Sequence, residues 1–335
     1  MSAPISKPRQ YSPDELNSYG EYIKIDGSPV PGLTLRHVLR GHTSTINRIA
    51  WSPDGQYLAS PSSDLTIRIW GANTGECVAV LRQHTAKVIS VAWSPDGHEL
   101  VSGSADHTAC IWDAATWRMK TDLGDHDYGV YSVAWSPSGG QIAVGLDNNM
   151  VYIWNTQSKQ VALTVRRGSG LIKSMLWLPD GQTLVCGDDA AFVAVWNTAA
   201  PALMWESDQH TTGVDCVAWS EHHQALFSGG SDKAIRGWNI RTGRQTRVLT
   251  GHTSEVCSLS FSADGAWLAS KAAGQAAAVR LWRCDTWDCV RTLREVQSGE
   301  WPPALAFHPH EAVLATLGEA NTVVRLWEVD DLGDR

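Results

Sequence analysis

The sequence lacks several features that would point to particular classes of protein. It has no excess of positive charge, because 27 basic and 35 acidic side chains give a formal net charge of −8. A protein that binds the phosphate backbone of nucleic acids needs a basic patch or stripe, so no nucleic-acid partner is expected. No uncharged apolar run reaches the roughly 18 residues that cross a bilayer, so no membrane partner is expected either.

A secretory signal and a disulfide framework are also missing. Residues 1–10 contain no apolar core of a signal peptide. The seven cysteines are an odd number and are scattered along the chain, which is typical of the reducing cytoplasm. A cytoplasmic location is therefore predicted. Hydrophobic residues make up 43% and charged residues 19% of the chain, which excludes a mostly disordered protein.

Tryptophan is abundant, with 17 residues, and most of them recur at a fixed interval. One series, separated by 42, 42, 42, 42, 44 and 45 residues, consists of Trp70, Trp112, Trp154, Trp196, Trp238, Trp282 and Trp327. A second aromatic series, 19 to 21 residues earlier, consists of Trp51, Trp93, Trp135, Trp177, Trp219, Phe261 and Phe307. A fixed period of this length indicates seven copies of one structural unit.

Each unit predicts four short β-strands. In the first unit, β-branched and aromatic residues fill the segments 46–51, 57–60, 66–70 and 77–81. Ser52-Pro53-Asp54-Gly55 predicts a turn, because proline fixes φ and glycine accepts a positive φ. One small antiparallel sheet buries little apolar surface, but seven can cover one another's faces in a ring. The predicted fold class is all-β, a seven-bladed β-propeller of four-stranded antiparallel blades.

The seventh unit has no fourth strand of its own. Its third strand is predicted over 323–327, and the sequence ends soon afterwards. The β-like segment Leu33–Leu39 precedes the first unit, and we expect it to complete the last blade by antiparallel pairing. The predicted domains are an N-terminal arm or strap at residues 1–32, the propeller at 33–330 and a C-terminal tail at 331–335.

Three units carry the same polar residues around the late tryptophan. A histidine is followed by serine 18 residues later, aspartate four residues after that, and tryptophan six residues beyond the aspartate. The members are His42, Ser60, Asp64 and Trp70 in unit one, His84, Ser102, Asp106 and Trp112 in unit two, and His210, Ser228, Asp232 and Trp238 in unit five. With the Gly41-His42 pair and the Ser-Pro-Asp-Gly turn, this pattern resembles the WD-repeat (WD40-type) β-propeller family over roughly residues 33–330. The resemblance implies a non-catalytic platform for protein–protein interaction.

His42, Ser60 and Asp64 also have the residue types of a hydrolase triad. A catalytic site usually occurs once per chain, whereas this set recurs three times at one spacing. We interpret the sets as structural hydrogen-bond networks, in which aspartate accepts from histidine, histidine bonds serine, and serine bonds the indole. Unit six keeps His252 and Ser270 but has Ala276 at the aspartate position.

No metal site and no cofactor are predicted. The sequence has neither a Gly-x-x-x-x-Gly-Lys-Ser/Thr phosphate loop nor a Gly-x-Gly-x-x-Gly dinucleotide motif. Cys284 and Cys289 have no second pair of ligands. His308-Pro309-His310-Glu311 falls where earlier units have a turn and lacks the helical spacing of a zinc motif.

The two ends of such a propeller differ in their connections. Loops that join consecutive blades, and loops that join the second and third strands of a blade, lie at one end, here called the loop face. Because binding concentrates on loops held by a rigid scaffold, the candidate partner-binding residues are those of the loop face: Lys87, Tyr128, Asp188, Asp189, Glu255, Glu300, Trp301 and Glu319. Trp301, before Pro302-Pro303, either anchors a partner or packs over the ring opening. The acidic members favour a basic peptide or protein.

The predicted function is a non-catalytic protein–protein interaction scaffold in the form of a monomeric propeller. Two alternatives stay open. The sequence ends directly after its last strand, which fits a sensor or regulatory module of a larger signalling or effector system. An enzyme with a site in the central channel is the other, but it needs converging carboxylates or histidines. The innermost strands carry mainly small or apolar residues. The polar exceptions are Asn47, Lys173 and Asp215, and only Asp215 is a carboxylate.

Overall fold

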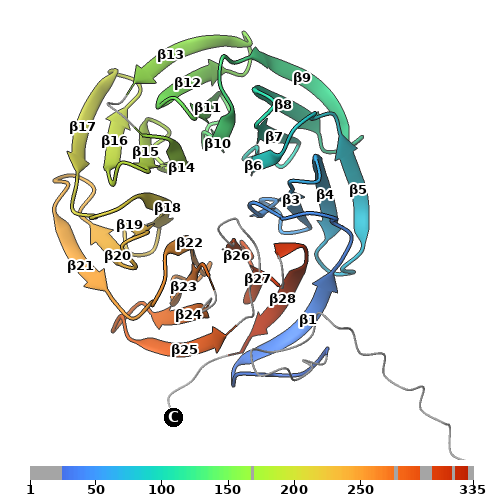
Figure 1. Cartoon of the computed structure of the whole chain (residues 1–335), viewed down its shortest axis with the longest axis vertical. Coiled ribbons are helices and arrows are strands. Elements are labelled where there is room, and N and C mark those ends of the chain that lie inside the picture. The colour runs from blue at the N-terminus through green and yellow to red at the C-terminus, as the bar shows by residue number, and fades with distance from the viewer. Residues whose placement is uncertain (1–24, 167–169, 275–277, 295–303, 319–320, 331–335) are drawn as a thin grey trace, which may run out of the picture.

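Seven sheets of four antiparallel strands surround a central channel (Figure 1). The computed structural model describes residues 25–166, 170–274, 278–294, 304–318 and 321–330. These residues form 28 β-strands and no α-helix. The predicted seven-bladed propeller is confirmed. The predicted tail at 331–335 and the first 24 residues of the predicted arm lie outside the described residues.

The first three blades each use four consecutive strands, ordered from the channel outward. Blade 1 contains β2 (Ala50–Trp51), β3 (Tyr57–Pro61), β4 (Thr66–Gly71) and β5 (Cys77–Arg82). Blade 2 contains β6 (Val88–Trp93), β7 (Glu99–Ser104), β8 (Thr108–Asp113) and β9 (Arg118–Asp125). Blade 3 contains β10 (Val130–Trp135), β11 (Gln141–Leu146), β12 (Met150–Asn155) and β13 (Gln160–Arg166).

The next three blades follow the same order, and the last blade departs from it. Blade 4 contains β14 (Ile172–Trp177), β15 (Thr183–Asp188), β16 (Val193–Asn197) and β17 (Ala202–Ser207). Blade 5 contains β18 (Val214–Ser220), β19 (Ala225–Gly230), β20 (Ile235–Trp238) and β21 (Gln245–Leu249). Blade 6 contains β22 (Val256–Phe261), β23 (Trp267–Ala272), β24 (Ala278–Arg283) and β25 (Cys289–Arg294). Blade 7 contains β26 (Leu305–Phe307), β27 (Val313–Leu317), β28 (Val324–Val329) and, as its outer strand, β1 (Leu33–Leu39).

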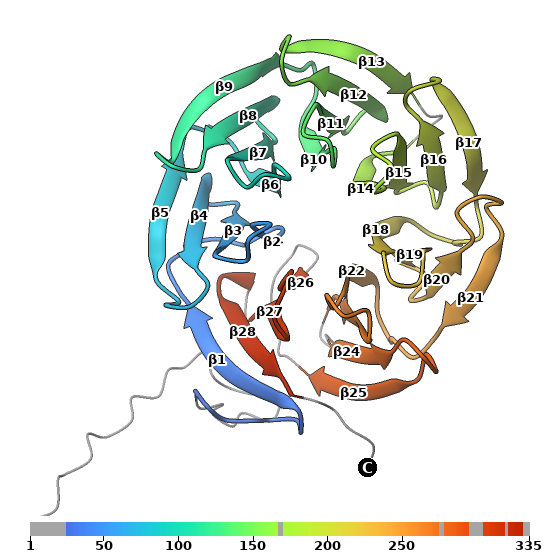
Figure 2. The same cartoon turned by 180° about the vertical axis from the view of Figure 1, so that it is seen from behind.

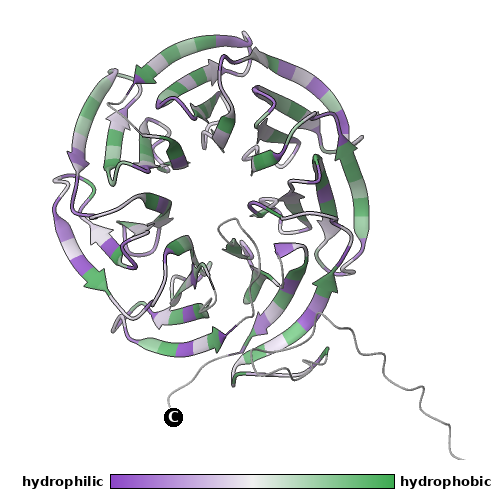
Figure 3. Cartoon of the chain, viewed as in Figure 1, coloured by the Kyte–Doolittle hydropathy of each residue, from purple (hydrophilic) through white to green (hydrophobic). Residues whose placement is uncertain are grey.

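Burial decreases from the second strand of a blade to the outer one. All six residues of β15 are buried, because neighbouring blades cover both faces of this sheet. In the outer strand β13 of the adjacent blade, most residues are exposed. Hydrophobic residues accordingly gather on the strands near the channel, whereas hydrophilic residues alternate along the outer strands (Figure 3). The propeller therefore has its core between blades rather than at one centre.

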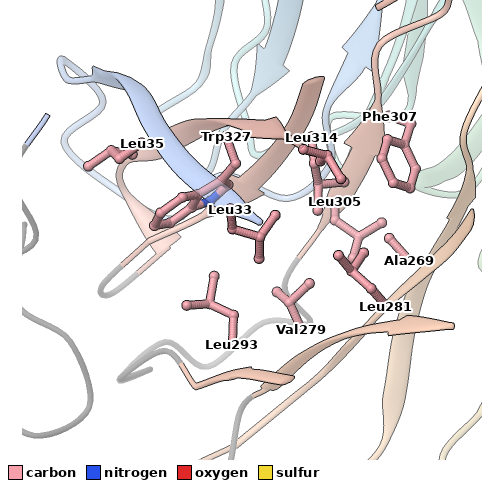
Figure 4. Packing of buried hydrophobic residues seen from close by; sticks show 11 residues of the cluster. Leu33, Leu35, Ala269, Val279, Leu281, Leu293, Leu305, Phe307, Leu314 and Trp327 are labelled. Atoms are coloured by element: carbon pink, nitrogen blue, oxygen red, sulfur yellow. The ribbon is translucent and has the colours of Figure 1, made fainter. Parts of the chain in front are cut away.

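Blade 7 is closed by a strand from the opposite end of the sequence. β1 pairs with β28 antiparallel over six residue pairs, among them Leu35 with Trp327, and the two strands lie side by side in both views (Figures 1 and 2). Leu33 and Leu35 are fully buried in a cluster that also holds Trp327 and, from blade 6, Leu293 (Figure 4). The predicted closure by the N-terminal strand is confirmed.

The early aromatic series joins one blade to the next. The Trp93 indole N–H donates to the Ala50 carbonyl of blade 1 at 3.1 Å, and Trp51 donates to the Ala306 carbonyl of blade 7 at the same distance. Trp177 repeats this bond to the Ala134 carbonyl of blade 3 at 3.2 Å. The bond is made at these three interfaces. Trp135 and Trp219 instead donate within their own blade, and Phe261 and Phe307 have no side-chain N–H.

The innermost strand of blade 1 is shorter than predicted. The segment 46–51 keeps only Ala50–Trp51 as a strand, together with an isolated bridge between Ile46 and Ser62. In blade 2 the equivalent strand pairs Ser90 with Gly103. One repeat earlier the second of these positions holds Pro61, which has no N–H to donate, so the ladder is interrupted opposite Arg48.

Candidate functional site

The histidine, serine, aspartate and tryptophan sets of blades 1, 2 and 5, here called the tetrads, are each assembled at one place. The distance between histidine Nδ1 and the aspartate oxygen is 2.8 Å for His42–Asp64, 2.9 Å for His84–Asp106 and 2.9 Å for His210–Asp232. Histidine Nε2 lies 2.8, 2.8 and 2.7 Å from the oxygen of Ser60, Ser102 and Ser228. The indoles of Trp70, Trp112 and Trp238 donate to the same oxygens at 2.8 Å.

Each tetrad satisfies all of its donors when the histidine is neutral. The ionised Asp64 accepts from His42 Nδ1, so Nε2 accepts the Ser60 O–H, and Ser60 accepts the Trp70 N–H. Burial alone would raise the pKa of Asp64, but the hydrogen bonds from His42 and Thr66 outweigh it and hold the pKa well below its usual range. The carboxylate therefore stays charged.

The geometry of the tetrads resembles a hydrolase triad, but the serine is inaccessible. Ser60, Ser102 and Ser228 each have an exposed fraction of 0%. A nucleophile must reach the substrate atom that it attacks, so these hydroxyls have no path to a substrate. Each tetrad therefore connects loops of the loop face to the third strand of its blade by hydrogen bonds.

Blades 3 and 6 show what happens when members of the set are replaced, two in blade 3 (Val144 and Asn148) and one in blade 6 (Ala276). In blade 3 the serine position is Val144, and no described residue accepts a hydrogen bond from the buried indole N–H of Trp154. In blade 6, Ser270 accepts from Trp282 at 2.8 Å and bonds His252 Nε2 at 2.7 Å. No described residue bonds His252 Nδ1, which is buried. Burial and the charge of Arg280 lower the pKa of His252 to about 4.

We expect the free energy of unfolding to fall as the pH drops from about 6.5 to about 4. His252 titrates near pH 6.5 when unfolded and near 4 when folded, so the unfolded state binds more protons in this window. The stabilisation is complete above the unfolded pKa and decreases toward the folded pKa, by up to about 3 kcal/mol. Urea titrations of the wild type and of His252→Gln across this range measure the effect.

The His252→Gln chain is expected to lose less stability than the wild type over the same range. His210, whose pKa is lowered mainly by burial, contributes in the same direction in both chains and so cancels in the comparison. Parallel pH profiles for the two chains would contradict the assignment to His252.

Four of the eight loop-face candidates are exposed. Lys87 lies between β5 and β6, Tyr128 between β9 and β10, Asp189 between β15 and β16, and Glu255 between β21 and β22. Tyr128 is the aromatic residue among the four, and 46% of it is exposed. Glu300, Trp301 and Glu319 lie outside the described residues.

The expectation that Asp188 faces a partner is wrong. Only 3% of this residue is exposed, and its carboxylate accepts the backbone N–H of Phe192 at 2.9 Å. Asp188 thus ends β15 and holds the turn into β16, where its charge is withdrawn from the surface. The neighbouring Asp189 is exposed, although one oxygen accepts the Leu171 N–H at 2.7 Å.

The polar residues predicted for the channel are paired with one another or with the backbone. Asn47 donates to the Val88 carbonyl at 2.6 Å. Lys173 Nζ lies 2.6 Å from one oxygen of Asp215, and Ser231 donates to the other at 2.7 Å. Burial would lower the pKa of Lys173, but the hydrogen bond and charge of Asp215 raise it.

Sequence reasoning passed over Arg48, which also lines the channel. A search for carboxylates and histidines does not find an arginine. A comparison of repeat positions does, because the equivalent residue is a serine in four other units, namely Ser90, Ser132, Ser174 and Ser258. Arg48 therefore stands out when the seven units are aligned on their period.

Two features are absent from the described part of the chain. No group of three or more histidine, cysteine, aspartate or glutamate side chains is gathered there as metal ligands would be. Within the same residues, no helix has the length and apolar character to cross a membrane.

The chain matches two family profiles. One, described as "IFT122 first beta-propeller", covers residues 31–246, and one described as "WD domain, G-beta repeat" covers residues 243–283. The first match spans more than half of the 335 residues.

Curated relatives match over short segments. Protein HIRA of Zea mays is 54% identical over 41 residues, which are 12% of this chain and 4% of HIRA. The "Probable cytosolic iron-sulfur protein assembly protein Ciao1" of Culex quinquefasciatus is 56% identical over 36 residues, 11% of each chain. The "F-box-like/WD repeat-containing protein TBL1Y" of Homo sapiens is 41% identical over 59 residues, 18% of this chain and 11% of that protein. The chain thus spans less than a fifth of the length of these three relatives.

A profile match over more than half of the chain, on a ring of seven blades that carries tetrads at the family's positions, shows that this chain belongs to the WD-repeat β-propeller family.

Proposed function

We propose that the chain is a non-catalytic protein-interaction scaffold that presents its loop face to a protein or peptide partner. The observation that carries this proposal is the contrast between the two parts of each blade. The inner strands and the tetrads are largely buried, and the tetrad side chains are hydrogen-bonded to one another, whereas the loop face exposes Tyr128, Lys87 and Glu255 on irregular loops. Rigid scaffolds with variable exposed loops are suited to recognition, because binding costs little ordering entropy.

The charges of the loop face suggest the charge of the partner. Asp189 and Glu255 are exposed acidic residues, and we propose that basic side chains of the partner lie opposite them. Tyr128 would be the aromatic anchor, since aromatic residues carry a large share of binding energy at interfaces. We further propose that the propeller acts as a monomer, and that it works in the cytoplasm, where its scattered cysteines stay reduced.

The test compares two triple variants by affinity purification and quantitative mass spectrometry. The first, Lys87→Glu, Tyr128→Ala and Glu255→Lys, changes the loop face. The second, Arg241→Glu, His98→Ala and Glu76→Lys, makes the same kinds of change at exposed residues of the opposite end. Both keep the net charge and avoid the tetrads.

We expect the amounts of the proteins that co-purify with the wild type to fall at least tenfold in the loop-face variant. The opposite-end variant should keep them. Loss in the opposite-end variant alone would move the binding surface to the other end. Identical co-purifying proteins in all three chains would refute the loop face as a binding surface.

A further inference from the structure

The central channel contains a cavity of about 530 Å³. Residues on or beside the innermost strands of all seven blades line it, among them Arg48, Lys173 and Asp215. A cavity of this volume lies within the range of small-ligand sites. Much of its wall is apolar and is formed by Ile49, Ile89, Leu259 and Leu305 among others.

Arg48 reaches across this channel. Its guanidinium donates to the backbone carbonyl of Lys173, which belongs to blade 4, on the opposite side of the ring from blade 1 (Figure 1). The strand around Arg48 is free to adopt this arrangement because Pro61 interrupts its ladder. The arginine is therefore held in the channel by one hydrogen bond to a neutral acceptor.

No described carboxylate forms an ion pair with Arg48. Asp215 is the one acidic residue among those that line the cavity, and its two oxygens accept from Lys173 Nζ and Ser231 Oγ, at 2.6 and 2.7 Å. The charged lining residues are thus two cations and one anion, and the anion is paired with Lys173.

The placement of Arg48 costs free energy. A guanidinium in a partly enclosed space loses hydration, and a neutral carbonyl does not compensate its charge. Burial accordingly lowers the pKa of Arg48. A ligand that supplies a carboxylate would recover part of this cost, because carboxylate and guanidinium form two parallel hydrogen bonds.

We propose that the channel is a binding site for a single carboxylate on a short apolar stem, with Arg48 as its main contact. The carboxylate pairs with the free edge of the guanidinium, and the stem lies against Ile89 and Leu259. A multiply charged phosphate fits less well, because the negative charge of Asp215 lines the same cavity. This site does not depend on the proposed scaffold role, since its ligand is either a free carboxylic acid or the acidic side chain of a bound peptide.

The site is tested by calorimetric titration with three probes. Butyrate supplies a free carboxylate on an apolar stem, the blocked dipeptide acetyl-Leu-Glu-amide supplies a peptide side chain, and n-butylammonium is the cation of matched size. Each is titrated to about 20 mM at constant ionic strength, because fragments of this size bind in the millimolar range.

We expect butyrate or the dipeptide to bind the wild type and n-butylammonium not to bind. Arg48→Gln should weaken carboxylate binding at least tenfold, whereas the control Arg82→Gln, at an exposed arginine of β5, should leave it unchanged. If Arg48→Gln does not fold, as judged by its melting curve, Arg48→Lys keeps the charge without the planar fork and should weaken binding severalfold.

Three results would overturn the proposal: no binding of either carboxylate, equal binding by n-butylammonium, or equal carboxylate affinity in the wild type and the Arg48 variant that folds. The two carboxylate probes separate the sources of the ligand. Tighter binding of the dipeptide assigns the site to a peptide side chain, and tighter binding of butyrate assigns it to a free acid.

Discussion

Deletion of residues 1–40 is expected to lower the melting temperature by about 10 °C or more. The deletion removes β1, whose Leu33, Leu35 and Leu39 are at most 1% exposed. Each buried leucine contributes about 1.5–3 kcal/mol, so the loss is roughly 5–9 kcal/mol. The deletion also exposes the unpaired edge of β28 and the indole of Trp327, which adds a risk of aggregation.

A second chain with only residues 1–24 deleted is the control, because this deletion keeps β1 and every described contact of the closure. Differential scanning calorimetry of the three chains separates the two effects. Leu35→Ala tests the same cluster without truncation and is expected to cost about 2–5 kcal/mol. An unchanged melting temperature after deletion of residues 1–40 would refute a stabilising role for this closure.

Asp64→Ala is expected to reduce the free energy of unfolding by about 3 kcal/mol. One oxygen of Asp64 accepts from His42 Nδ1 at 2.8 Å and from the Thr43 N–H at 3.1 Å. The other accepts from the backbone N–H and hydroxyl of Thr66 at 3.0 and 2.6 Å. The substitution leaves these donors without their acceptor, and His42 is buried, so water does not replace it freely.

Asp54→Ala is the matched control in the same blade. Asp54 lies in the exposed turn between β2 and β3, where it accepts from Ser52 Oγ and the Gln56 N–H, at 2.6 and 3.0 Å. Because Asp54 is exposed and accepts two hydrogen bonds rather than four, the expected loss is about 1 kcal/mol or less. Equal losses in the two variants would contradict the special role of the tetrad.

Asp64 also affects how the free energy of unfolding depends on pH in the acidic range. The folded pKa of Asp64 is held below its unfolded value near 3.9, so its contribution is complete above that value and is lost as the pH falls below it. Asp64→Ala should therefore flatten the decline of stability below about pH 4. A variant that instead lost an enzymatic activity while keeping its stability would favour the triad interpretation.

The number of blades and the place of most strands follow from the sequence alone. The aromatic period counts the units, some of whose indoles join blades, as Trp93 does with the Ala50 carbonyl, and turn residues such as Gly55 mark where strands end. The tetrads follow as well, because the spacing from His42 to Trp70 is fixed by three strands and the two turns between them. These contacts lie within one unit or between neighbouring units, so a repeated local pattern contains them.

The contacts that only the tertiary structure decided are those outside this pattern. The burial of Asp188 depends on how its turn folds back on Phe192, and the exposure of a loop residue is not a property of its period. Arg48 and Lys173 meet although 125 residues separate them, because ring closure brings blades 1 and 4 to opposite walls of one channel. The period determines which blades are neighbours, but the distance across the ring depends on the angle between all seven, and no single segment of the chain encodes that angle.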